Sequence, residues 1–269
     1  MTPGGILLGM KTPVSVVVIT KNEEENIADC LSSASWADEI ILVDDESSDR
    51  TLEIARRFTD KIFQRRMDNE GRHRNWAYTQ ARNDWVLSLD ADERVTPELA
   101  EEVAKLLQGK PPFKAYGIPR RNYIGNYWLR YGGEYPAPQV RLFLKKEFKY
   151  EEAEVHPRAL MEGATGYLRG DILHYSHRDL SDYLRSLNGH TTLEAKKWYL
   201  SGKKISLGRA VWRAVQRTFL TRLLRKKGYK DGVYGLAVAY FSGVYQIVSW
   251  LKYRELVEKN GPAKNGPPA

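Results

Sequence analysis

The sequence predicts an α/β fold in which helices flank a mostly parallel sheet. Val14 to Thr20 (VSVVVIT) and Glu39 to Asp44 (EIILVD) are short, apolar, β-branched runs, as in strands that are buried on both faces. A helical pattern follows each run, over Asn22 to Ser33 and over Ser48 to Phe58. Strands that alternate with helices favour parallel pairing with right-handed crossovers.

The alternation continues to about residue 108. A short strand, a helix and a further strand are expected at Lys61 to Gln64, Gly71 to Arg82 and Trp85 to Leu89. Thr96 before Pro97 predicts an N-cap and the first position of a helix that runs to about Gln108.

Three polar clusters follow expected strands of this sheet. They are Thr20 to Glu23, Asp44 to Asp49 and Asp90 to Arg94. Ligands of parallel sheets bind beyond the carboxyl ends of the strands. We therefore expect the three clusters to converge on one crevice.

The pattern changes after Gly109. Short strands of a mixed sheet are expected at Ala115 to Arg120, Gln139 to Leu144, Glu154 to Leu160 and Tyr167 to His174. Helices are expected at Leu180 to Leu200, Leu207 to Arg225 and Gly232 to about Glu258. We divide the chain into an N-terminal tail (1–12), an α/β domain (13–178, with halves that meet at about 110), a helical region (179–258) and a disordered tail (259–269).

Composition narrows the class and the compartment. Hydrophobic residues make up 42% of the chain and aromatic residues 11%, which is enough for a packed core and argues against general disorder. The single cysteine, Cys30, forms no internal disulfide, and Met1 to Lys11 is too short and Gly-rich for a secretory signal. We expect a cytoplasmic protein.

The positive charge is concentrated in one segment. Ser201 to Lys230 contains ten Lys and Arg and no Asp or Glu, and so carries a formal charge of +10. The whole chain has a net charge of +8, so the rest of the chain carries 8 − 10 = −2. An anionic partner suits such a segment, either phospholipid headgroups or nucleic acid. Apolar residues recur mostly every three or four positions within this segment; they are Leu207, Val211, Trp212, Val215, Phe219 and Leu223. The arginines lie largely on the other side of the expected helix; they are Arg209, Arg213, Arg217 and Arg225.

This amphipathic pattern favours an anionic membrane surface. Gly232 to Leu251 then carries no formal charge, but its glycines, tyrosines and Gln246 favour an in-plane or re-entrant helix, or packing in a homodimer, over a membrane span. A solvated basic face over an ordinary core helix is the alternative.

Asp90, Ala91 and Asp92 carry the clearest chemistry. They follow a buried strand, at the point where the chain turns away from the sheet. Two carboxylates at this spacing suit Mg²⁺ or Mn²⁺, which also bridge diphosphate oxygens. An isolated Asp-X-Asp is more typical of a solvated turn or of charge at a helix N-terminus, but the preceding apolar strand favours a metal site here.

Together these segments resemble the inverting glycosyltransferase family 2, which has a nucleotide-binding GT-A fold. The resemblance runs from about Val14 to His174 and rests on VSVVVITKNEEENIADCL, EIILVDDESSDRTLEIA and GRHRNWAYTQARNDWVLSLDADERV, with QVRLF and EVHPR beside them. The chain looks most like bacterial transferases that build lipopolysaccharide core or related lipid-linked glycans. The resemblance implies a GT-A Rossmann-like sheet flanked by helices, here with a C-terminal basic amphipathic helical extension, and a divalent cation (Mg²⁺ or Mn²⁺) as cofactor.

Residue roles follow from the resemblance by position. Donor binding is implied for Thr20, Lys21, Asn22, Glu23, Asp45, Arg72, Arg74, Asn75, Asp90 and Arg141. Asp45 falls where uracil and ribose are recognised, whereas Asp44 is expected to hold the loop. Metal binding is implied for Asp90 and Asp92, with Asp92 the more direct ligand. A solvated helix face for Arg72 and a structural ion pair for Arg141 are the alternatives.

The general base is less clearly marked. Many relatives carry Val-His-Glu near Glu154-Val155-His156-Pro157, so a proline stands here in place of the expected glutamate. We assign the base first to Glu154 and second to Glu134. His156 is expected to complete the metal shell or to orient the acceptor, and His174 competes for these roles; a structural histidine is the alternative for each.

The expected function is metal-dependent, inverting transfer of a sugar from a UDP-sugar, UDP-glucose for example, to a hydroxyl of a lipid-linked or lipopolysaccharide-core acceptor. The enzyme is expected at the inner face of the cell membrane. Transfer to polyprenyl phosphate, whose phosphate needs little help from a base, is the alternative. A nucleic-acid-binding module is a remote alternative, because no recognised nucleic-acid motif accompanies the basic helices.

Overall fold

The computed structural model describes residues 11–152, 158–202 and 204–261. Within them the chain forms two compact units. The first comprises residues up to Arg121 together with Ala137–His174, and the second comprises Asn122–Pro136 together with residues from Tyr175 onward. The chain therefore crosses three times from one unit to the other.

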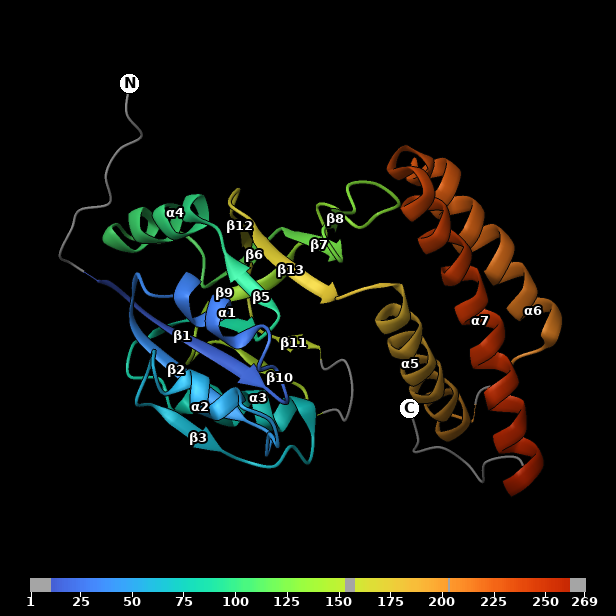
Figure 1. Cartoon of the computed structure of the whole chain (residues 1–269), viewed down its shortest axis with the longest axis horizontal. Coiled ribbons are helices and arrows are strands. Elements are labelled where there is room, and N and C mark those ends of the chain that lie inside the picture. Colours follow the sequence, from blue (N-terminus) through green and yellow to red (C-terminus); the bar gives the residue numbers. More distant parts are fainter. Residues whose placement is uncertain (1–10, 153–157, 203, 262–269) are drawn as a thin grey trace. The chain divides into compact units, whose positions relative to one another are not determined.

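A seven-stranded sheet forms the centre of the first unit (Figure 1), in the order β12-β6-β9-β4-β1-β2-β3. Its strands are β1 (Thr12–Thr20), β2 (Ala37–Asp44), β3 (Ile62–Gln64), β4 (Trp85–Asp90), β6 (Ala115–Ile118), β9 (Gln139–Leu144) and β12 (Gly166–Tyr167). The pairs among β3, β2, β1 and β4 are parallel, whereas β9 is antiparallel to both β4 and β6. The predicted parallel half is thus confirmed, and the second half extends the same sheet as a mixed portion.

The uninterrupted apolar run of β1 reflects burial on both faces of this sheet. Val16 belongs to a core cluster with Leu31 and Leu99, whereas Val17 belongs to a second cluster with Tyr78. Because successive strand residues point to opposite faces, both sets of valines are buried. The helices of this unit are α1 (Ile27–Ser33), α2 (Thr51–Ala55), α3 (Glu70–Thr79) and α4 (Pro97–Gln108). Residues of α1, α2 and α4 join the first cluster, and residues of α3 join the second.

The ends of the helices follow local chemistry. The predicted N-cap of α4 is confirmed, because the Thr96 hydroxyl accepts a hydrogen bond from the Leu99 N–H at 3.3 Å. The first helix begins at Ile27 and not at Asn22, because Asn22 has a φ of 54° and a turn precedes the helix. Such a left-handed conformation ends regular structure and is better tolerated by Asn than by most residues.

Two short pairings complete the first unit. β10 (Lys149–Tyr150) pairs antiparallel with β11 (Ala159–Leu160), and β5 (Glu93–Val95) pairs antiparallel with β13 (Ile172–His177). The sequence pattern did not predict β5. Its pairing brings His174 opposite Glu93, and this places the histidine beside the Asp90 to Asp92 turn.

Helices form most of the second unit. They are α5 (Leu180–Leu200), α6 (Leu207–Trp212), η1 (Arg213–Arg225), η2 (Gly228–Asp231) and α7 (Gly232–Asn260). Two short strands, β7 (Arg120–Ile124) and β8 (Tyr127–Trp128), pair through Tyr123 and Ile124. All three expected helices are confirmed, although η1 is wound as a π-helix: the N–H of Lys226 donates to the carbonyl of Thr221, five residues earlier, at 2.9 Å. Among the described residues no helix combines the length and the apolarity needed to cross a membrane.

Buried polar and aromatic contacts hold this helical unit together. The Asp231 carboxylate accepts hydrogen bonds from the N–H groups of Arg130 (3.2 Å) and Tyr131 (2.8 Å). The rings of Trp198 and Tyr253 meet edge to face, with centroids 6.4 Å apart. Asn122–Pro136 is therefore attached to the helices by hydrogen bonds to a buried carboxylate.

Candidate active site

The carboxyl ends of three parallel strands coincide in register. Thr20 of β1 lies opposite Asp44 of β2, and Ile19 of β1 lies opposite Asp90 of β4. A cavity of about 290 Å³ opens at this edge of the sheet. Its lining residues are Ile19, Thr20, Lys21, Glu23, Asp45, Met67, Asp90, Ala91, Asp92 and His174. The three polar clusters therefore do converge on one crevice.

Asp45 is fixed by two donors at one wall of this cavity. Its Oδ1 accepts from the Met67 N–H at 2.7 Å, and its Oδ2 pairs with Lys21 Nζ at 2.8 Å. Burial by itself would raise the pKa of Asp45, but the hydrogen bonds from Lys21 and Met67 outweigh it and lower that pKa. The Thr20 hydroxyl nearby is buried and has no hydrogen-bond partner in the described part of the chain. One ionised carboxylate and one available hydroxyl thus face the cavity.

Asn22 and Asp44 hold the loops next to the cavity through hydrogen bonds. The Asn22 N–H donates to Ser47 Oγ at 2.8 Å, and its side-chain oxygen accepts from the Ser48 N–H at 2.8 Å. Asp44 accepts from the Ser47 N–H at 2.9 Å, as expected for a residue that holds the loop. Neither residue lines the cavity. Asn22 joins the loops after β1 and β2, and its predicted contact with the donor stays a prediction.

Asp90 lies between two arginines. Its Oδ1 pairs with Arg74 Nη2 at 2.9 Å and its Oδ2 with Arg141 Nη2 at 2.7 Å. Burial would raise the pKa of Asp90, but the charges of Arg141 and Arg74 dominate and hold that pKa well below its ordinary value. The side chain of Arg141 is only 3% exposed, so its ion pairs are screened little by water.

Glu93 completes this ion-pair cluster, although the sequence reasoning did not single it out. Its side chain is fully buried; Oε1 pairs with Arg141 Nη2 at 2.7 Å, and Oε2 accepts from the Asp90 N–H at 3.0 Å. The acidic run Asp90-Ala91-Asp92-Glu93 offered the only signal for it. Strand-like alternation through β5 would have turned Glu93 inward.

Asp92 and His174 form a second pair at the cavity. His174 Nε2 lies 3.3 Å from Asp92 Oδ2, and both side chains are partly exposed. No three His, Cys, Asp or Glu side chains among the described residues form a ready metal site. Mg²⁺ commonly binds through one or two protein ligands together with substrate phosphates. Asp92 and His174 offer donor atoms close enough to bind one cation side by side, so the residues fit a metal that is shared with a diphosphate.

The Gly-X-X-Arg-Asn region contributes in different ways. Arg74 reaches Asp90, whereas Arg72 is exposed and pairs with Asp68 (2.8 Å) and Glu152 (3.1 Å). Both ends of the Asn75 amide bond the backbone of Tyr150, each at 2.8 Å. None of the three lines the cavity. Asn75 thereby attaches α3 to β10, and the predicted donor contacts of Arg72 and Asn75 stay predictions.

The candidate bases have different surroundings. Glu154 and His156 lie outside the described residues. Glu134 belongs to the second unit, where one carboxylate oxygen pairs with Arg222 and the other accepts from Asn122 Nδ2 at 3.2 Å. Its role as a base stays a prediction.

Two cavity residues escaped the sequence reasoning: Ile19 and Met67. Ile19 adjoins the predicted polar residue Thr20, but Met67 lies in a loop without periodicity. Met67 approaches Asp45 through its backbone N–H, and a side-chain pattern carries no signal for such a contact.

Comparison with known proteins finds glycosyltransferases that are similar to this chain. The lipopolysaccharide core biosynthesis glycosyltransferase LpsC of Rhizobium meliloti (strain 1021) is 25% identical over 250 residues, which span 90% of this chain and 92% of LpsC. An uncharacterized glycosyltransferase of Rickettsia typhi is 27% identical over 232 residues, which span 78% of this chain and 77% of the relative. The crystal structure of S. aureus TarS 1–349 aligns with a TM-score of 0.45 at 14% identity and covers 96% of this chain and 98% of that one.

The family model of glycosyl transferase family 2 matches residues 15–164, which is more than half of the chain. The match includes every described residue that lines the cavity except His174. The chain therefore belongs to glycosyl transferase family 2 and is a glycosyltransferase.

Proposed function

We propose that this enzyme transfers a sugar from a UDP-sugar, with inversion, to a hydroxyl of a lipid-linked or lipopolysaccharide-core acceptor. The observation that carries the proposal is the cavity at the ends of β1, β2 and β4, where Asp45 and the Asp92–His174 pair face the same space. The name of LpsC supports the class of acceptor. Asp45 is assigned to the uracil and ribose, as the family resemblance implies.

Binding of the divalent cation is assigned to Asp92 and His174. A bound Mg²⁺ or Mn²⁺ would stabilise the negative charge of the departing nucleotide diphosphate. Asp90 has both oxygens paired with arginines and fixes the turn that presents Asp92, and its predicted binding of the metal and the donor stays a prediction. Arg74 and Arg141 do not line the cavity and contact Asp90, and their predicted contacts with the donor stay predictions as well. The base that takes the acceptor proton is assigned to Glu154, with Glu134 as the second candidate.

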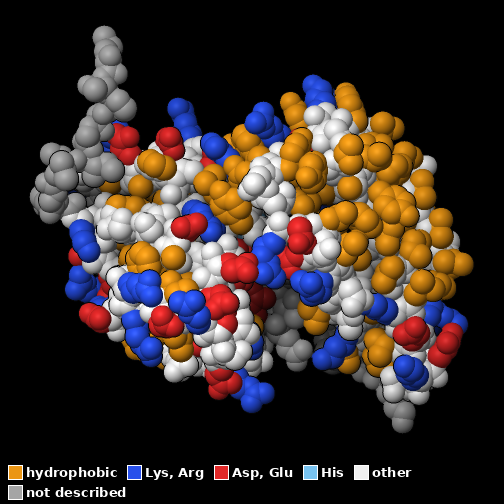
Figure 2. Space-filling view, viewed as in Figure 1, with side chains coloured by type: hydrophobic (Ala, Val, Ile, Leu, Met, Phe, Trp, Pro, Cys, Tyr) orange, Lys and Arg blue, Asp and Glu red, His pale blue; other side chains and the backbone are white. Residues whose placement is uncertain are grey.

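A second proposal concerns the helical unit, which we propose associates with an anionic membrane surface. Leu207, Val211, Trp212 and Val215 follow one side of α6 and the start of η1 and are 43–57% exposed. On α7, large hydrophobic residues are exposed as well; they are Val233, Tyr234, Leu236, Tyr240 and Leu251. Figure 2 shows hydrophobic side chains gathered over these helices. Exposed apolar side chains beside a basic segment suit the headgroup region of a bilayer.

Nucleotide release tests the first proposal. The full chain is incubated with UDP-, GDP- and CMP-sugars, with and without Mg²⁺ or Mn²⁺, and with core oligosaccharide or polyprenyl phosphate as acceptor. We expect UDP release that needs both a divalent cation and the core oligosaccharide. Equal turnover without the cation would refute the metal assignment, and turnover with polyprenyl phosphate alone would establish the alternative acceptor.

Vesicle sedimentation tests the second proposal. We expect the full chain to sediment with phosphatidylglycerol vesicles at low salt and much less with phosphatidylcholine vesicles. Light scattering distinguishes a homodimer that covers the same residues. A salt-dependent shift with DNA, without vesicle binding, would favour a nucleic-acid partner instead.

A further inference from the structure

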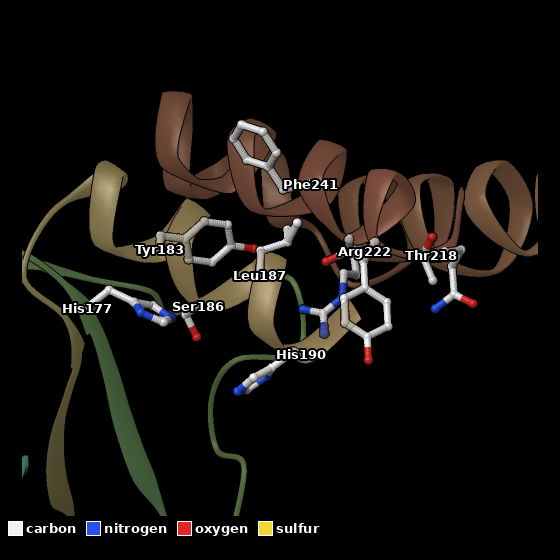
Figure 3. Close-up of a pocket in the computed structure, with 11 residues that line it drawn as sticks. His177, Tyr183, Ser186, Leu187, His190, Thr218, Arg222 and Phe241 are labelled. Carbon is white, nitrogen blue, oxygen red and sulfur yellow. The ribbon is translucent and has the colours of Figure 1, made fainter. Parts of the chain in front are cut away.

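The helical unit contains a cavity of its own. Its volume is about 320 Å³, at the lower end of the range of about 300–1,000 Å³ for ligand pockets. Residues of α5, η1 and α7 line it, together with His177 at the end of β13; they are His177, Tyr183, Ser186, Leu187, His190, Thr218, Arg222, Phe241, Ser242, Tyr245 and Gln246. Figure 3 shows Arg222 and His190 among the residues that line it. A space of this size fits one sugar or one headgroup, not an oligosaccharide.

The charge of the lining is one-sided. Among the described residues that line the cavity, Arg222 carries a positive charge, two are histidines, and none is Asp or Glu. Arg222 is anchored through one nitrogen, since Nη1 pairs with Glu134 and also reaches the Gly132 carbonyl at 3.4 Å. Its Nε and Nη2 have no hydrogen-bond partner in the described parts of the chain. An arginine held at one end, with further N–H groups available, is suited to bind the oxygens of an anion.

The remaining lining suits a polar, ring-shaped ligand. Gln246 Oε1 is buried without a hydrogen-bond partner among the described residues, so an acceptor faces inward for a ligand hydroxyl. Tyr183 and Phe241 supply aromatic surface, with ring centroids 5.8 Å apart. Burial raises the pKa of Tyr183 to about 12, and the Glu134 charge adds to this effect, so its hydroxyl remains a donor at neutral pH. Aromatic surface with a few placed polar groups is typical of small-molecule sites.

We propose that this cavity binds one acidic sugar of the acceptor, a sugar that carries a phosphate or carboxylate group. Arg222 takes the acidic group, Gln246 takes a hydroxyl, and Tyr183 and Phe241 pack against the ring. Glu134 is then a positioning residue for Arg222. The inference rests on the proposed function, because an acceptor glycan is what brings such a sugar to the enzyme. A phospholipid headgroup offers the same phosphate chemistry, and the test separates the two sources.

Binding of glucose 6-phosphate to the full chain, measured by calorimetry without any nucleotide sugar, tests the inference. We expect binding at least about tenfold tighter than that of glucose or of inorganic phosphate. Arg222→Gln is expected to weaken it at least about tenfold, whereas Arg185→Gln removes an exposed arginine of α5 that lies outside the cavity and leaves it unchanged. Equal affinity for inorganic phosphate, or equal affinity in Arg222→Gln, would overturn the proposal.

A second variant guards against misfolding, because Arg222→Gln also removes the partner of Glu134. Ser186→Phe fills the cavity while both residues of that ion pair are kept, and it is expected to abolish binding. Ser181→Phe, which places the same ring at an exposed position of α5, is the matched control. If Ser186→Phe binds like the control, the cavity is not the site and the proposal fails.

Competition identifies the source of the acidic group. Phosphatidylglycerol vesicles that displace glucose 6-phosphate would overturn the glycan source in favour of a lipid headgroup, whereas the absence of displacement is the expected result. Binding of glucose 6-phosphate is measured without a nucleotide sugar, so its result does not depend on catalysis. A chain that binds glucose 6-phosphate but turns over no UDP-sugar would contradict the proposed function alone, and the reverse result would contradict the cavity alone.

Discussion

The two cavities of this chain have opposite chemistry. Among the described residues, the lining in the first unit includes Glu23, Asp45, Asp90, Asp92 and one lysine. The described lining in the helical unit includes Arg222 and two histidines and no carboxylate. An acidic cavity repels a diphosphate unless a cation lies between them, but a basic cavity binds an anion directly. Metal dependence should therefore belong to the first cavity, and acidic ligands without a metal should belong to the second.

The units also differ in where their charges lie. Asp90, Arg74, Arg141 and Glu93 form a connected cluster in which two side chains are at most 3% exposed. In the helical unit, large apolar side chains and much of the basic segment remain at the surface. The ion pairs of the first unit thus fix the turn at Asp90 to Asp92, whereas the charged side chains of the basic segment are largely exposed to solvent. Substitutions in the two units should change different measurements.

Asp92→Asn should have the largest effect. Loss of the proposed metal ligand beside His174 is expected to lower kcat/KM for transfer at least about a thousandfold and to abolish the response to added Mn²⁺. Steady-state nucleotide release measures both effects. Asp60→Asn, an exposed aspartate without a described contact, is the control and should match the wild type. Retention of a tenth of the activity by Asp92→Asn would show that the acidic cavity works without this ligand.

Asp90→Asn should mainly lower stability. It leaves the largely buried Arg74 and Arg141 without their shared anion, which is expected to reduce the free energy of unfolding by about 3 kcal/mol at pH 7. Urea unfolding measures the change. Asp68→Asn, which removes one of the two carboxylate partners of the exposed Arg72, is the control and should cost much less.

The pH dependence of that difference follows from the lowered pKa of Asp90. Because the pKa in the folded state lies below the unfolded value of about 3.9, Asp90 stabilises the fold fully at neutral pH and loses this contribution as pH falls below about 4. The stability gap between wild type and Asp90→Asn should therefore narrow in acid. A gap that stayed constant from pH 7 to pH 3 would contradict the ion-pair account.

Much of the first unit could be predicted from the sequence, because its signals are local. Buried strands appear in the sequence as apolar runs, and the polar residues directly after them lie at the carboxyl edge of the sheet. Thr20, Asp45, Asp90 and Asp92 could therefore be predicted as residues of the site, and all four line the cavity. The contacts of Glu93 and Met67 were not predictable in this way. Glu93 depends on the pairing of β5 with a strand almost eighty residues away, and Met67 contributes only its backbone.

The helical unit shows the converse limit. Helical periodicity predicted α5, α6 and α7, but it could not show that Arg222 would meet Glu134 or that a cavity would open among three helices. Such features depend on how helices pack against one another, and the sequence of one helix does not determine the packing angle. The acidic cavity could thus be predicted from the sequence, whereas the basic cavity could not.

Asp45→Asn should have an intermediate effect on the first cavity. The loss of charge weakens the contact with Lys21 and the proposed contact with the nucleotide, so KM for the UDP-sugar is expected to rise about tenfold with little change in kcat. Steady-state kinetics with UDP- and GDP-sugars measure this and the preference for uracil. Glu46→Gln, the exposed neighbour, should leave KM unchanged. An equal fall in kcat would assign Asp45 to catalysis and not to donor binding.

Trp212→Ser should have the smallest effect, and it tests the outward face of the helical unit. Trp212 is 57% exposed, so its replacement removes little internal packing and should barely alter the free energy of unfolding. Loss of its partial burial in the headgroup region should weaken binding to phosphatidylglycerol vesicles about fivefold. Phe58→Ser, at an exposed aromatic residue of the first unit, is the control and should bind vesicles like the wild type. If the two variants bind equally, the exposed apolar residues of α6 and α7 do not contact the membrane, and a second copy of the chain becomes their expected partner.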